Sequence, residues 1–172
     1  MMGAMTTWSD FRAAAPDLEA RAKAILTSTT NCVLGTVRAD GSPRLSGIDP
    51  FFVDGELHLG SMPDARKADD LRRDPRLALH AVPWESRRVK DGADAPGEAD
   101  AKLTGRAVEL PADEARAVFT AYFAERGIDE APDDGYLFRV ELDSVATVHV
   151  EGDQLVIDRW TATDGRKTIR RS

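Results

Sequence analysis

Cysteine is almost absent from this chain of 172 residues, in which Cys32 is the only one. A single thiol cannot form an internal disulfide, and it excludes a zinc site built from several cysteines. The three histidines, His58, His80 and His149, are far apart in the sequence and lack the spacing of metal ligands. We therefore expect no metal site, and we expect a reducing, cytoplasmic compartment.

Long apolar runs and an excess of positive charge are also missing. No stretch approaches the roughly 20 apolar residues that span a bilayer, and the opening residues MMGAMTTWSD lack both a basic start and an apolar run. The net charge is −7 and the pI is near 5.0, which disfavours nucleic acids and anionic membranes. We expect no membrane and no nucleic acid as a partner.

The pattern of a Rossmann fold is missing as well, since no glycine-rich first turn is followed by long helices that alternate with parallel strands. The chain instead has short strands in hairpin order. Asp-Gly pairs at 40–41 and 54–55 are two-residue turn signals. They separate alternating or apolar runs at about 31–38, 43–53 and 56–60, which we predict to be strands.

The rest of the chain adds further strands and helices. We predict more strands at about 76–83, 101–110, 138–142, 145–151 and 154–160, and helices over 8–26 with a break at Pro16, over 66–74, and from Pro111 to just before Gly127. A hydrophobic content of 42% suits one well-buried core. The sequence therefore predicts a single domain over 1–172: mainly β, an antiparallel barrel with added helices.

Two segments have no regular pattern. The charged stretch 85–100, which contains glycine and proline, is expected to be a mobile surface loop or a flap over a site. Residues 1–7 are expected to be flexible.

The stretch 57–79 is the part of the sequence most suggestive of a binding site. Asp64 is a plausible N-cap, and it places Arg66 and Lys67 in the first turn of a helix, where the backbone already carries partial positive charge. Cations at that place are unfavourable unless an anion lies between them. With Ser61 at the end of the preceding strand, the pattern indicates a phosphate site. The alternative is that the two cations simply pair with Asp69 and Asp70 at the surface.

The strand before this stretch suits a ligand wall. It mixes polar and small residues in the run RLSGID where a core strand would be apolar. Gly47 within it indicates that a ligand or another backbone approaches closely.

These segments, taken in order, carry a resemblance. From about Asn31 to Leu110, the run VLGTVRADGSPRLSGIDPFFVDGELHLGSMPDARKADDLRRDPRLALH and the later LTGRAVEL resemble the split β-barrel flavoproteins related to pyridoxamine 5′-phosphate oxidase. The resemblance implies a split antiparallel β-barrel of the FMN-binding type. It also implies a homodimer that holds the cofactor at its interface.

Site residues follow from the resemblance position by position. Arg66 and Lys67 would bind the cofactor phosphate, with help from Ser61. Residues of the preceding strand would flank the ribityl chain and ring, namely Arg44, Ser46, Gly47 and Ile48. Trp160 would approach the site from the other subunit. The tail TDGRKTIRRS has arginines but not the histidine of the true oxidase, which argues against vitamin B6 oxidation.

The expected function is therefore an FMN-dependent oxidoreductase that acts on a small organic substrate by hydride transfer. The cofactor supplies the redox chemistry, so no catalytic triad is required, and no catalytic residue is assigned. Two alternatives remain open: a reductase that uses the deazaflavin coenzyme F420, and a flavin- or haem-binding protein without turnover. His80 is a weak catalytic candidate, because a histidine on the polar side of a strand is usually solvated or satisfied locally.

Overall fold

The computed structural model describes residues 6–28, 31–81, 99–128 and 134–172. The helices are α1 (Trp8–Ala14), α2 (Pro16–Thr27), α3 (Arg66–Arg73) and α4 (Ala112–Ala124). The strands are β1 (Cys32–Val37), β2 (Pro43–Ile48), β3 (Pro50–Val53), β4 (Glu56–Ser61), β5 (Arg76–Ala81), β6 (Asp100–Glu109), β7 (Tyr136–Glu151), β8 (Gln154–Thr161) and β9 (Gly165–Arg171).

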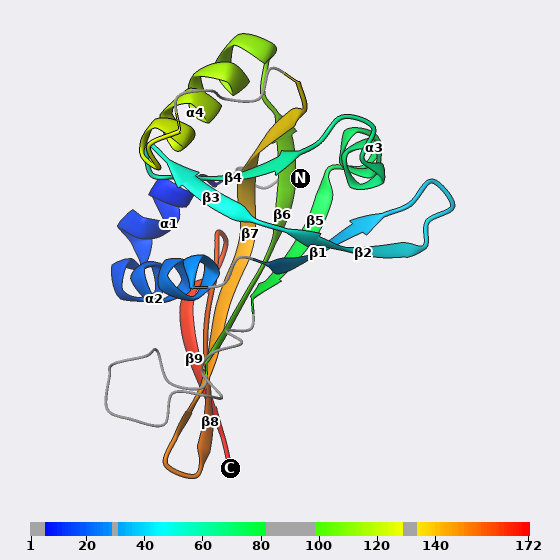
Figure 1. The fold of residues 1–172 in the computed structure, drawn as a ribbon. Coiled ribbons are helices and arrows are strands. Elements are labelled where there is room, and N and C mark those ends of the chain that lie inside the picture. The colour runs from blue at the N-terminus through cyan, green and yellow to red at the C-terminus, as the bar shows by residue number, and fades with distance from the viewer. Residues whose placement is uncertain (1–5, 29–30, 82–98, 129–133) are drawn as a thin grey trace.

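The strands form one antiparallel sheet in the order β2-β1-β5-β6-β7-β4-β3, and β8 and β9 extend it from β7 (Figure 1). Asp49 alone separates β2 from β3, which lie at opposite ends of that order. The sheet therefore curls round into a split barrel. The prediction of a mainly β, split antiparallel barrel with added helices is confirmed.

Local signals in the sequence correspond to local structure. The Asp-Gly turns form as expected, because Gly41, Asp54 and Gly55 all have positive φ. Gly127 also has a positive φ, of 69°, and it ends the turn after α4, where the amide of Ile128 donates to the carbonyl of Phe123.

Several boundaries differ from the prediction. The predicted strand 43–53 is broken at the exposed Asp49, and the strands predicted at 138–142 and 145–151 are one continuous β7. The tail, which was not assigned any structure, forms β9. Asp64 is not the N-cap of α3: that position is Ala65, without a side-chain hydrogen bond, and Asp64 lies at a positive φ of 59° in the turn before it.

The core lies between the sheet and helices α1 and α2. Trp8 and Phe11 of α1 are fully buried and meet edge to face, with ring centroids 5.4 Å apart. The indole Nε1 of Trp8 donates to buried Glu19 of α2 at 2.5 Å, so the two helices are joined by a polar contact inside an apolar layer.

Side chains alternate between two faces of the sheet. Along β5, Leu77, Leu79 and Ala81 are buried, whereas Ala78 and His80 point the other way. The first face, covered by the helices, is called here the covered face; the second is called the open face.

The predicted loop lies largely outside the described residues. Of 85–100, only Ala99, which is buried, and Asp100, which begins β6, belong to them. Most of the predicted flexible segment 1–7 also lies outside them. Within the described residues, no helix is long and apolar enough to cross a membrane.

Candidate functional site

Helix α3 packs beside the β1–β2 hairpin and brings its first two cations close to β2 (Figure 1). The Nζ atom of Lys67 donates to the carbonyl oxygen of Gly47 at 2.9 Å. The side chain of Arg66 is exposed. Two of the predicted phosphate ligands therefore stand at the edge of the predicted ligand wall.

Asp70 links α3 to both strands of the hairpin. It is 2% exposed, and its carboxylate accepts hydrogen bonds from Arg44 Nε at 2.5 Å, from Thr36 Oγ1 at 2.8 Å and from Arg73 at 3.2 Å. Burial by itself raises the pKa of Asp70, but these hydrogen bonds outweigh it, so the pKa lies below the ordinary value of 3.8. The alternative pairing of Asp70 with Lys67 is not formed.

A polar hollow of about 350 Å³ lies between α3 and the hairpin. We call it the arginine hollow, because four of its lining residues are arginines: Arg38, Arg44, Arg66 and Arg73, together with Ala39, Asp40, Asp69 and Asp70. Among the described residues, Arg66 has no hydrogen-bonding or ion-pair partner. The structure thus places Arg44 and Arg66 around one cavity.

Ser61 ends β4, and its Oγ atom is buried without a hydrogen-bond partner among the described residues. A buried hydroxyl in this state is costly, and it points to a group that is still to be bound. The remaining predicted residues of β2 alternate: Ser46 is half-buried, Gly47 is exposed and Ile48 is buried.

The prediction for Trp160 is not supported. Its side chain is 4% exposed and packs against Phe11, with ring centroids 4.8 Å apart, in the core of its own subunit. The period of a strand gives the reason: on β8 the neighbouring Arg159 takes the opposite face and is exposed.

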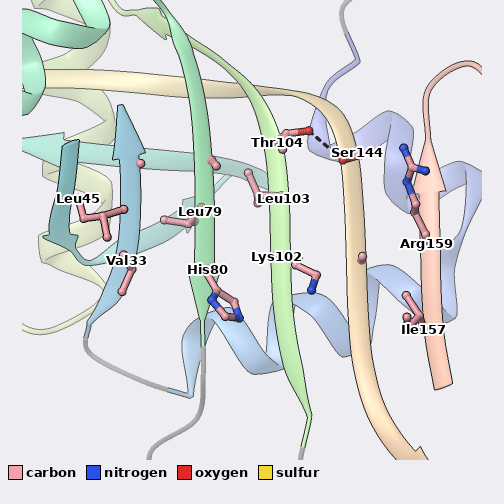
Figure 2. A pocket seen from close by; sticks show the side chains of 13 residues that line it. Val33, Leu45, Leu79, His80, Lys102, Leu103, Thr104, Ser144, Ile157 and Arg159 are labelled. Carbon is pink, nitrogen blue, oxygen red and sulfur yellow. Dashed lines mark hydrogen bonds between the residues drawn. The ribbon is translucent and has the colours of Figure 1, made fainter. Parts of the chain in front are cut away.

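The open face has a second hollow, which encloses about 660 Å³ (Figure 2). We call it the open-face hollow. Most of its floor is apolar or small; the polar side chains that line it are His80, Lys102, Thr104, Ser144 and Arg159, and the others are Val33, Gly35, Leu45, Ala78, Leu79, Leu103, Ala146 and Ile157. All of them belong to strands.

One row of paired residues crosses this face. In order of strand pairing it runs through Gly47, Val33, His80, Lys102, Ala146 and Arg159. Residues that are paired in this way share a face, and neighbouring strands lie about 4.8 Å apart. The row therefore connects the residue that Lys67 contacts to the centre of the open-face hollow.

Two polar pairs belong to this face. The Nε2 atom of His80 lies 2.9 Å from Asp100 Oδ2. The hydroxyls of Thr104 and Ser144 are hydrogen-bonded at 2.8 Å, as the dashed line in Figure 2 shows.

Large apolar side chains are exposed mainly on the open face. By strand register, five of the seven that are exposed among the described residues belong to it: Val33, Leu45, Val150, Leu155 and Ile169. Leu45 is 75% exposed. Several exposed apolar side chains on one face are typical of a surface that another molecule covers.

The histidines do not gather. Among the described residues, no group of histidine, cysteine, aspartate or glutamate side chains could hold a metal ion. His58 is 4% exposed, and its Nδ1 lies 3.0 Å from the carbonyl oxygen of Glu56. Its pKa is lowered, chiefly by burial.

Comparison with known proteins decides the family. A family model described as pyridoxamine 5′-phosphate oxidase matches residues 18–152. The chain belongs to the pyridoxamine 5′-phosphate oxidase family. The match extends from α2 to the end of β7, so β8 and β9, with Arg159, lie beyond it. No curated protein sequence matches the chain.

Solved structures of this family's fold are similar to the chain. One is a pyridoxamine 5′-phosphate oxidase-related, FMN-binding protein from Nostoc punctiforme PCC 73102, with a TM-score of 0.62, 12% identity and coverage of 94% of this chain and 96% of that one. Another is PhzG from Burkholderia lata 383 in complex with tetrahydrophenazine-1-carboxylic acid, with a TM-score of 0.61, 14% identity and coverage of 94% and 89%.

A third similar structure is a haem-binding protein from Mycobacterium smegmatis, with a TM-score of 0.58 and 24% identity. The alignment covers 83% of this chain but only 57% of that one. At these identities, the likenesses show the shared fold.

Sequence reasoning missed three residues of this region: Asp70, Lys102 and Arg159. Asp70 was considered only as a surface partner for the neighbouring cations, because the sequence around it contains no signal that it is buried. The strand period around Lys102 and Arg159 could have placed both on the open face, but only strand pairing shows that they share a row.

Proposed function

We propose that this protein is an FMN-dependent oxidoreductase that acts as a homodimer on a small organic substrate by hydride transfer. The observation that carries the proposal is the grouping of cations where α3 packs beside β2: Arg44 and Arg66 line the arginine hollow, and Lys67 donates to the carbonyl oxygen of Gly47. The family match supports it, as does the FMN-binding neighbour from Nostoc punctiforme.

The residues at this junction fit a phosphate group. Arg66 has no partner among the described residues and lines the arginine hollow with Arg44, whose Nε donates to Asp70. Ser61 Oγ, at the end of β4, is buried and unpaired among the described residues. Hydrogen bonds from cations to phosphate are roughly twice as strong as those between neutral groups. Arg44, Arg66, Lys67 and Ser61 would therefore hold the FMN phosphate without a covalent link.

When bound, FMN would supply the hydride chemistry. The tasks of the chain are to bind, to orient and to exclude water. Arg44 is fixed by Asp70, and Lys67 is fixed by Gly47, so the cations would hold the ligand in one register along β2. The adjoining open face provides an apolar surface from which a second subunit would exclude water.

The dimer is proposed on the exposed apolar side chains of the open face. Val33 and Leu45 lie on one side of the open-face hollow, and Val150, Leu155 and Ile169 lie on the other. A second copy that contacts both patches would close the hollow between them.

A cytoplasmic location is proposed from the single cysteine. Its thiol is inert, because burial, and then the charge of Asp49, raises the pKa of Cys32 to about 11.

Two other functions share this site. A reductase that uses coenzyme F420 would need the same phosphate ligands, and a flavin- or haem-binding protein without turnover is favoured by the likeness to the haem-binding protein. The visible spectrum of the purified protein, and titration with each cofactor, separate the three.

The decisive experiment titrates FMN and riboflavin, which lacks the phosphate, against the wild type and Lys67→Ala. We expect the variant to bind FMN about 10- to 100-fold more weakly, which corresponds to about 1.5–3 kcal/mol for a hydrogen bond to a charged group, and to bind riboflavin unchanged. The matched control is Arg76→Ala, an exposed cation already paired with Asp74. Equal losses for both flavins would contradict the phosphate site, and tight binding without any turnover would favour a carrier.

A further inference from the structure

We propose that the open-face hollow binds an apolar molecule that carries a carboxylate, and that Lys102 and Arg159 hold this carboxylate between them. The assignment of this molecule as the substrate rests on the proposed function; the binding site itself rests on the structure. The site lies on β1, β2 and β5 to β8 and shares no lining residue with the arginine hollow, and its Arg159 wall is beyond the family match.

The two cations lie on either side of a small residue. Lys102 and Arg159 stand opposite Ala146 from either side, in one row across β6, β7 and β8 (Figure 2). Strand spacing puts their backbones about 10 Å apart. In Figure 2 the amine of Lys102 and the guanidinium of Arg159 point in opposite directions along their strands, so a change of rotamer would bring both to one small anion.

Both charges are without a counter-charge in the described part of the chain. Among the described residues, neither Lys102 nor Arg159 has an ion-pair or hydrogen-bonding partner. Most other arginines of the structure have one, as the ion pairs of Arg21, Arg44, Arg72, Arg73, Arg76, Arg139, Arg166 and Arg170 show.

The nearest carboxylate does not remove this charge. Asp100 shares the face and strand of Lys102, but its Oδ2 atom is taken by His80 Nε2 at 2.9 Å. No acidic side chain lines the hollow among the described residues. The hollow is therefore positive at its centre within a chain whose net charge is −7.

The floor of the open-face hollow is apolar. Leu45, Val33, Leu79, Leu103 and Ile157 give an apolar surface, and a volume of about 660 Å³ lies within the roughly 300–1,000 Å³ that ligand sites usually have. A fully hydrated ion would leave this floor uncovered. The occupant must combine an apolar body, which covers the floor, with a single anionic group.

A carboxylate is the anion that suits the pair. Arg159 can offer a guanidinium edge to both carboxylate oxygens, and Lys102 adds a point charge. A phosphate would find more cations in the arginine hollow.

The experiment compares 2-naphthoate with its uncharged analogue 2-naphthamide by isothermal titration, with the wild type and with the double variant Lys102→Met/Arg159→Met. We expect the wild type to bind the acid at least tenfold more tightly than the amide. The double variant should bind both with equal affinity, because methionine keeps an unbranched apolar side chain at each position and removes the charge. Arg171→Met, which loses an exposed cation of the open face outside the hollow, should keep the preference for the acid.

Two further measurements keep the result decisive. FMN is titrated with the same variants: an unchanged FMN affinity with a lost preference for the acid supports the site. If the wild type does not bind FMN but binds the acid more tightly than the amide, the proposed function is wrong and the carboxylate site is supported. Equal affinity of the wild type for acid and amide would overturn the site. So would variants that keep the preference but dissociate in sedimentation velocity, since their cations would then be paired with the other copy.

Discussion

The covered face and the open face of the same sheet differ in whether their charged side chains are paired. Where helices pack on the sheet, Asp70 of α3 and Asp158 of β8 are at most 4% exposed, and each has several partners. Asp158 accepts from Thr168 of β9 and pairs with Arg21 of α2 at 2.8 Å and with Arg166 at 3.4 Å. On the open face, Lys102 and Arg159 have no partner among the described residues.

This difference distinguishes the charges that stabilise the fold from the charges that are available for binding. A carboxylate buried beneath a helix must be paired, because an unpaired buried charge is strongly destabilising. A cation on the open face remains in contact with solvent, so the lack of an ion-pair partner lowers the stability of the fold only slightly. Removing a polar group that serves the fold should therefore lower the free energy of unfolding strongly. Removing one from the open face should change the free energy of unfolding little and should weaken the binding of another molecule to that face.

The largest effect that tests this contrast is expected from Asp70→Ala. The variant leaves Arg44 and Thr36 without their buried acceptor, and we expect it to lower the free energy of unfolding by about 3–5 kcal/mol, as measured by urea denaturation. Asp69→Ala, on the exposed side of the same helix, and Lys102→Ala should each change it by about 0.5 kcal/mol or less. Similar losses for Asp70→Ala and Lys102→Ala would remove the distinction between the faces.

The next effect concerns association through the open face. Leu45→Glu places a charge among the exposed apolar side chains, and we expect the dimer to dissociate about 100-fold more readily, which is about 2.7 kcal/mol. Met62→Glu is the matched control: Met62 is 77% exposed and Leu45 is 75% exposed, but Met62 lies beyond the end of β4. Sedimentation equilibrium measures both. A monomeric wild type, or equal effects of the two variants, would count against the open face as the interface.

The smallest effect is a pH dependence from His58. Its folded-state pKa is below the ordinary 6.5, chiefly because of burial, so the unfolded chain binds more protons as the pH falls. The free energy of unfolding should therefore decline from pH 6.5 down to the folded pKa, by up to about 1.4 kcal/mol per pH unit. His58→Gln should flatten this limb in urea denaturation at a series of pH values, whereas His80→Gln on the open face should leave it in place.

Much of the fold could be predicted because its signals are local. Asp-Gly pairs fix hairpins, the proline at 16 restarts a helix, and the alternation at 138–142 gives the buried side of β7. β9 escaped prediction because Gly165–Arg171 is polar and exposed, so it lacks a buried period. Pairing with β8 and the contacts of Asp158 with Thr168 and Arg166 hold it, and these contacts are invisible in the tail's own sequence.

The candidate site could be predicted only where its residues are close in sequence. Arg66 and Lys67 are adjacent in the chain, and they do stand beside β2. Trp160 was assigned to the site by the resemblance alone, and the structure places its side chain in the core of its own subunit. Its burial depends on Phe11, which is distant in the sequence. Lys102 and Arg159 meet only through strand pairing, which no local pattern specifies.

The long strand β7 has a consequence for the order of folding. It pairs with β4, β6 and β8, and its residues, 136–151, follow β4 and β6 in the chain. While the ribosome has released residues 1–135 alone, the facing edges of β4 and β6 have no strand between them. Unpaired edges invite association between nascent chains, so barrel closure should wait until β7 has been released, and chaperones that shield strand edges should matter most in that interval.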